Sequence, residues 1–90
     1  MIEGDARPDP GRELYVRHAR IDGNSVALLR AIELGDSCIV EAEVWPVNAD
    51  PGDSPLLPGP YSFRSPVEAT RFVTHAVEAL IVLGCEVHAS

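Results

Sequence analysis

The stretch SVALLRAIELGDSCIVEAEVW, residues 25–45, decides how this chain of 90 residues folds. The triplet GDS at 35–37 divides it into two apolar halves, and the second half, CIVEAEVW, is rich in β-branched residues. The first half is ambiguous, because Ala27, Leu28 and Leu29 are also good helix formers, Ser25 suits a helix N-cap and Gly35 suits a helix C-terminus. We predict a strand over residues 25–34, with a helix as the alternative, because segments of about ten residues between short turns are typical of a β-meander.

Residues 12–21, RELYVRHARI, supply the preceding strand of the same meander. They alternate roughly between apolar and polar side chains, as a half-buried strand does. The DGN triplet at 22–24 then indicates a hairpin, since Gly and Asn tolerate a positive φ. The segment after residue 37, CIVEAEVWPV, is the third predicted strand.

The C-terminal third contains a helix that begins with a capping box. Ser65 suits the N-cap, Pro66 stands where a missing N–H costs nothing, and Glu68 completes the Ser-x-x-Glu pattern. The helix is expected to run to Leu83 and to stop at Gly84. At 100° per residue one stripe should face the sheet: Ala69, Phe72, Val73, Ala76, Leu80 and Leu83. The opposite side carries Glu68, Arg71, His75 and Glu78.

The predicted fold class is α+β: a three- to four-stranded antiparallel meander packed against one C-terminal helix, in the order β-β-β-(β)-α. The optional strand is YSF at 61–63, and CEVHA at 85–89 is either a short final strand or a frayed tail. Residues 12–90 form a single domain, because the chain is too short for two. Residues 1–11 are expected to be a flexible N-terminal tail, and residues 46–60 a Pro-rich loop.

A two-residue turn at Gly35 and Asp36 predicts the register of the second hairpin. Leu34 then lies opposite Ser37, and the pairs continue at a constant index sum. One face receives small residues that suit a packed helix: Ala27, Leu29, Ala31, Val40, Ala42 and Val44. The other receives Val26, Leu28, Ile32, Ile39 and Trp45 around a cross-strand pair of Arg30 with Glu41.

The second face carries more apolar surface than one helix covers, and exposed apolar patches on small domains mark interaction surfaces. The last helical turns add Ile81 and Val82, which project away from the sheet. The predicted interaction surface is therefore Val26, Leu28, Ile32, Ile39, Trp45, Leu56, Leu57, Ile81 and Val82. A homodimer is the simplest way to cover it.

The loop over 46–60 holds five of the chain's eight prolines. We interpret its central part, residues 48–59, as an ordered cover and contact arm, with Leu56 and Leu57 buried on the sheet or on a second copy. Proline's fixed φ lowers the entropy that ordering costs. Docking of the PLLP segment at 55–58 in an aromatic groove of another protein is an alternative.

Charge and composition exclude several classes of function. The net charge of −7 repels phosphate backbones, so nucleic acid is an unfavourable partner. No apolar run approaches the ~20 residues of a membrane span. Two cysteines, Cys38 and Cys85, do not make a disulfide scaffold, and a reducing cytoplasm is the expected location. Lysine and glutamine are absent, which we attribute to a GC-rich bacterial genome.

Candidate chemical groups lack the pattern of an active site. Glu41 and Glu43 share a strand face about 6.5–7 Å apart, near a glycosidase spacing, but alternating acids on a strand are typical of a solvated face. His75 and Glu78 could begin a metal site with Cys85 and His88, completed by Cys38 or His18; we predict a surface charge network instead. We expect no catalytic residue, no metal and no cofactor.

These observations predict a small non-catalytic module for protein interaction or assembly, with a homodimer and an unidentified protein as partners. The layout also resembles, in architecture alone, single-strand DNA-binding folds of the whirly and positive-cofactor-four proteins. Such binders need aromatic platforms in a positive groove, which Tyr15, Arg17, Trp45, Tyr61 and Arg64 would have to supply. A ligand-binding domain with a pocket under the Pro-rich loop is a further alternative.

Overall fold

Two tight turns place the first three strands side by side in the computed structural model, which describes residues 11–46 and 52–89. Strands β2 (Arg12–Ile21) and β3 (Asn24–Glu33) are joined by Asp22 and Gly23, both with positive φ, as a type I′ hairpin turn requires. Strand β4 (Cys38–Val44) follows. The segment 25–34 is therefore a strand over nearly its whole length, and its helix-forming residues do not make a helix.

The register of the β3–β4 hairpin is the predicted one. Ala27 lies opposite Val44, and the pairing continues in step to Ile32 opposite Ile39. The turn closes with the Leu34 N–H donating to the Ser37 carbonyl at 2.9 Å. The division of these two strands into a small-residue face and a larger apolar face is thereby confirmed.

Two short strands extend the meander at its edges. Strand β5 (Tyr61–Phe63) pairs with β4, and strand β6 (Glu86–Ala89) pairs with β2. The result is a five-stranded antiparallel sheet in the order β5-β4-β3-β2-β6. The fold is α+β as predicted, and the strand beyond the expected three or four is β6, since the CEVHA segment is a strand and not a frayed tail.

Helix α1 (Pro66–Val82) starts at the predicted cap. The Ser65 hydroxyl accepts the Glu68 N–H at 3.3 Å, and the Glu68 carboxylate accepts the Arg64 N–H at 3.1 Å. The reciprocal bond of the capping box thus goes to the residue before the cap. At the other end Leu83 is the C-cap and Gly84, at φ +101°, turns the chain into β6.

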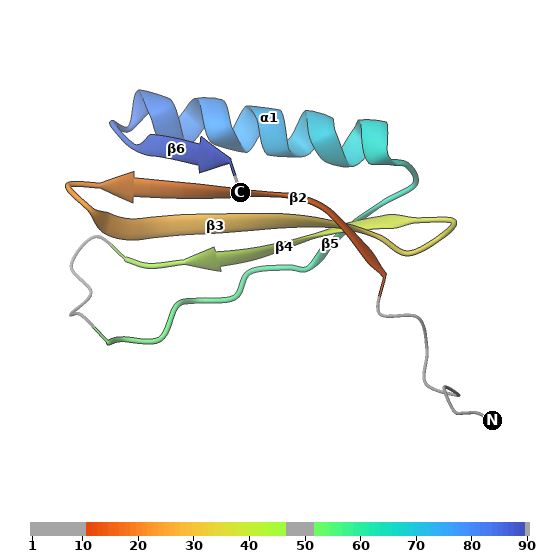
Figure 1. The fold of residues 1–90 in the computed structure, drawn as a ribbon, viewed down its shortest axis with the longest axis horizontal. Helices are drawn as coiled ribbons and strands as arrows, with labels where there is room; N and C mark the ends of the chain where they lie inside the picture. The colour runs from red at the N-terminus through yellow and green to blue at the C-terminus, as the bar shows by residue number, and fades with distance from the viewer. Residues whose placement is uncertain (1–10, 47–51, 90) are drawn as a thin grey trace.

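The helix lies along one side of the sheet (Figure 1) and buries the small-residue face. Ala69 and Val73 are buried against Leu29, Ala31, Val40 and Ala42. Phe72, Ala76 and Leu80 are partly buried on the same stripe, and the four polar residues predicted for the outer side are exposed. Leu83 is the exception: it is 72% exposed at the C-cap, where the chain turns through Gly84 towards β6.

Gly11 lies directly before β2, close to the side chains of Ile32 and Leu34. It has a φ of +86°, and a Cβ there would lie 2.7 Å from Ile32 Cγ2 and 2.7 Å from Leu34 Cδ2. A residue with a side chain would therefore meet both strain and a clash. The remainder of the predicted flexible tail, residues 1–10, lies outside the described residues.

Candidate interaction surface

The side of the sheet away from α1 forms a surface that we call the open face. Side chains alternate along a strand, so the even-numbered residues of β3 point away from the helix that packs on Leu29 and Ala31. No described helix lies on that side (Figure 1). The register places on it all five sheet residues of the predicted interaction surface: Val26, Leu28, Ile32, Ile39 and Trp45.

These five side chains are half-buried within the single chain, because neighbours on the twisted face shield one another. Trp45 lies at the end of β4, where its backbone N–H donates to the Val26 carbonyl at 2.9 Å. Val16, opposite Arg30, also lies on this face and is only 7% exposed. Its place follows from the alternation in residues 12–21, although sequence reasoning did not single it out.

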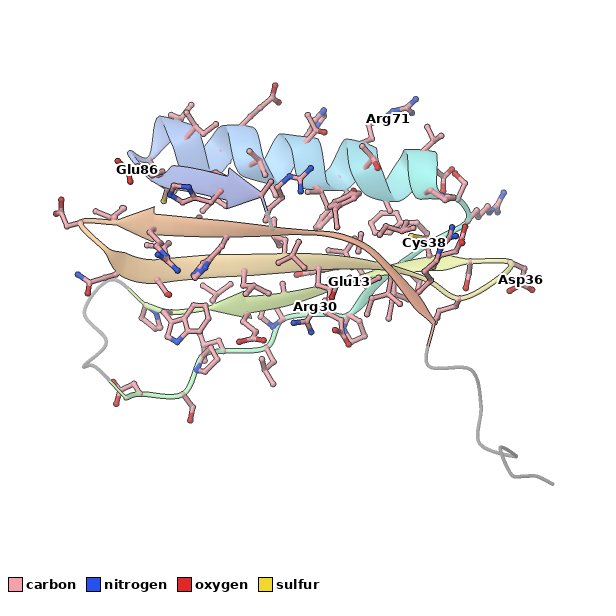
Figure 2. The ribbon with its side chains drawn as sticks, viewed as in Figure 1. Glu13, Arg30, Asp36, Cys38, Arg71 and Glu86 are labelled. Carbon is pink, nitrogen blue, oxygen red and sulfur yellow. The ribbon has the colours of Figure 1, made fainter. Side chains whose placement is uncertain are left out.

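Arg30 is the charged centre of the open face. Its Nη1 lies 3.3 Å from Glu41 Oε1, as the predicted cross-strand pair requires, and its Nε lies 3.1 Å from Glu13 Oε1. Figure 2 shows Glu13 and Arg30 side by side on the sheet. The Nε–H is not aimed at that oxygen closely enough for a hydrogen bond, and it has no other acceptor in the part of the chain that the structure describes. Glu13 was not anticipated, since its β2 register depends on a bulge between Glu13 and Tyr15.

Two histidines lie opposite each other on the β2–β6 side of the open face. His18 on β2 lies opposite His88 on β6, and the His18 ring contacts the Ser25 hydroxyl (2.9 Å) and the Arg20 guanidinium (3.2 Å). Burial, with Arg20 and His88 nearby, lowers the pKa of His18 below its ordinary value, and Glu43 opposes this only in part. The imidazole is therefore kept neutral near pH 7.

The described part of the Pro-rich loop lies along an edge of the sheet. Leu56 makes two backbone hydrogen bonds with Val44, 2.8 and 2.9 Å long. Paired residues project to the same side, so Leu56 shares the helix side with Val44. Leu56 and Leu57 are both exposed, by 60% and 70%. The loop therefore does not bury them within one chain, and a contact arm to a second copy stays a prediction.

The end of α1 carries a separate apolar area. Ile81 and Val82 are 55% and 86% exposed, in keeping with the prediction that they project away from the sheet. They belong to the helix side of the molecule. They are therefore not continuous with the open face, and one contact surface does not contain both.

The candidate catalytic and metal-ligating groups are dispersed. Glu41 and Glu43 do share the open face, with Glu41 held by Arg30. Cys38 is fully buried, and burial with the Glu33 carboxylate raises the pKa of its thiol. In residues 11–46 and 52–89 no three His, Cys, Asp or Glu side chains converge as metal ligands, a search that includes His75, Glu78, Cys85 and His88.

The aromatic and basic residues considered for nucleic acid do not form one platform. Arg17 stacks 4.7 Å above the Tyr15 ring on the helix side of β2. Tyr61 packs on Phe72 with ring centroids 4.9 Å apart. Trp45 lies on the opposite, open face.

A groove between β2 and α1 is a feature that sequence reasoning missed. It has a volume of about 170 Å³, and the Tyr15 hydroxyl meets Thr70 Oγ1 across one end at 2.9 Å. These two residues are 55 positions apart in the chain, so no local pattern joins them.

Among the described residues no helix is long and apolar enough to cross a membrane. Comparison of the chain with protein-family models, with curated proteins and with solved structures found no match.

Proposed function

We propose that this chain is a small non-catalytic assembly module that forms a homodimer through its open face. The observation that carries the proposal is that the single described helix covers only one face of the five-stranded sheet. The other face, which bears Leu28, Ile32, Ile39 and Trp45, has no covering element among the described residues. Pairing two such faces removes apolar surface from water in both copies at once.

The charges of the open face support the same proposal. The Arg30 guanidinium lies at its centre between Glu13 and Glu41, and the Arg30 side chain is 37% exposed. A second copy would bring further carboxylates to that exposed part, and charge-assisted hydrogen bonds are the stronger ones.

Sedimentation of the intact chain and one face variant tests the dimer. Leu28→Arg places a cation in the middle of the open face, opposite Glu43, so the monomer fold tolerates it. Val67→Arg is the matched control, because Val67 is 65% exposed at the start of α1 and far from the open face. We expect a dimer for the wild type and for Val67→Arg, and a monomer for Leu28→Arg.

A wild-type chain that sediments as a monomer at every accessible concentration would overturn the proposal, as would a Leu28→Arg chain that remains a dimer. Adding an oligothymidylate to the same runs addresses the nucleic-acid alternative. No co-sedimentation is expected, because the net charge of −7 opposes phosphate binding. We place the protein in the reducing cytoplasm, a proposal supported by two cysteines that are buried and unpaired.

A further inference from the structure

Strand β2 is paired along only part of its outer edge. Strand β6 pairs with residues 17–20, and no described strand pairs on that side with residues 12–16. An unpaired edge presents backbone N–H and C=O groups that another strand can use. Within residues 11–46 and 52–89, no strand therefore occupies the position that continues the line of β6 along β2.

The groove lies beside this free part of β2. It is lined by strand and helix residues together: Tyr15, Arg17, Thr70, Val73, Thr74, Val77 and Glu78. Its volume of about 170 Å³ is well below the ~300–1,000 Å³ of sites that bind drug-sized molecules, so it suits a single side chain. Val73 and Val77 supply apolar wall, and the two threonines supply hydroxyls.

Arg17 is the cation at this groove. Its guanidinium stacks on Tyr15 and donates to the Val16 carbonyl at 3.0 Å. Arg12 and Arg30 have carboxylate partners at 2.7–3.3 Å, whereas no carboxylate of the described residues pairs with Arg17. Glu78 lines the same groove without a described ion pair to Arg17, so a carboxylate placed on Arg17 from outside the chain displaces no existing partner.

We propose that the β2–α1 groove binds an extended, acidic peptide segment of a partner protein. The segment adds to residues 12–16 of β2 as an antiparallel strand, inserts one apolar side chain against Val73 and Val77, and places a carboxylate on Arg17. Addition of a strand to a sheet edge is an established mode of peptide recognition. As Arg17 turns to the carboxylate it releases the Val16 carbonyl, which then accepts an N–H from the added strand.

Strand β6 is an example, within the chain, of a short strand that pairs with this edge of β2. It pairs with β2 in antiparallel sense, and its Val87 packs against the Ala19, Ala27 and Cys85 cluster. The proposed segment repeats that arrangement further along the same edge. The site differs from the dimer surface of the proposed function, since it lies at the edge and on the helix side of the sheet.

The test is an amide chemical-shift titration of the intact, ¹⁵N-labelled chain with the peptide acetyl-Thr-Val-Thr-Asp-Thr-amide, whose Val and Asp are two residues apart and therefore project to the same side of an extended strand. Shifts are expected in residues 12–17 and 70–78. The same peptide with Lys in place of Asp should bind about tenfold more weakly, because it lacks the charge-assisted bond to Arg17. The chain's net charge of −7 by itself favours the Lys peptide, so a preference for Asp reports the local site.

Two variants assign the site. Thr74→Phe fills the groove and should abolish the shifts, whereas His75→Phe, the adjacent exposed residue that does not line the groove, should leave them. Arg17→Gln should erase the preference for Asp over Lys. Retained amide dispersion in each variant shows that it is folded.

The proposal is overturned if neither peptide shifts the groove residues, if shifts occur only on the open face, or if Thr74→Phe leaves binding unchanged. It is also overturned if Arg17→Gln keeps the Asp preference. Repeating the titration with Leu28→Arg separates the two proposals, because groove binding should persist whether the chain is a monomer or a dimer.

Discussion

At the scale of single residues, Ser65 decides where α1 begins. Its hydroxyl accepts the Glu68 N–H, one of the donors that a helix start leaves unpaired. Ser65→Ala should lower the free energy of unfolding by about 1 kcal/mol. Denaturant unfolding measures it, and Ser65→Asp, which restores an acceptor, should recover most of the loss. An unchanged midpoint for Ser65→Ala would show that the cap does not contribute.

His18 makes stability depend on pH. Its pKa is lowered in the folded state, first by burial and then by Arg20 and His88. The unfolded chain therefore binds a proton more readily, and stability should fall as pH drops through the unfolded value of about 6.5 toward the lower folded value. Below the folded pKa the loss from His18 is complete.

Thermal melts between pH 8 and pH 5 measure this dependence. His18→Gln should make the fall shallower, and His88→Gln should reduce it less because His88 is only one contributor. A pH profile identical to the wild type in His18→Gln would rule out His18 as the source.

At the scale of elements, the β3–β4 register makes Arg30 and Glu41 neighbours across the hairpin. Reversing both charges should recover part of the stability lost by reversing either one. The coupling in a double-mutant cycle should be about 0.2–1 kcal/mol, since both side chains are partly exposed. Glu13 also contacts Arg30, so the cycle is repeated in Glu13→Gln as its control. Zero coupling in both backgrounds would contradict the pair.

The Pro-rich loop poses a question about contact between copies. Leu56 and Leu57 are exposed within the chain, so replacing both with serine should change monomer stability little. If the loop is an arm that reaches a second copy, the same change should weaken the dimer. Melts of the monomeric Leu28→Arg background give the first quantity, and sedimentation of the otherwise wild-type chain gives the second. Unchanged sedimentation would show that the loop only pairs with the edge of β4 and does not contact a second copy.

At the scale of the whole molecule, the open face links folding to association. Whatever binds the folded state and not the unfolded state stabilises it by mass action. The melting temperature of the wild type should therefore rise with protein concentration, and that of Leu28→Arg should not. Differential scanning calorimetry over a concentration series measures both. Equal behaviour of the two chains would contradict a dimer formed through this face.

Local chemistry was sufficient to predict much of this structure from the residues alone. Gly23 and the Gly35–Asp36 turn determine both hairpins, because turn geometry sets register and register assigns every side chain of β3 and β4 to a face. Ser65, Pro66 and Glu68 likewise determine the helix start. The β3 and β4 residues of the open face followed from these local features, whereas Glu13 on β2 did not.

Tertiary structure decided what depends on contacts between distant segments. Residues 25–34 have good helix formers, and they are a strand because β3 pairs on both sides and buries Leu29 and Ala31. Strand β6 exists because Gly84 returns the chain to β2. Since β6 reaches only residues 17–20, the outer edge of residues 12–16 has no partner strand in the described part of the chain, and the groove lies beside Arg17. No local pattern contains these features, because each is set by pairing and packing between segments far apart in the chain.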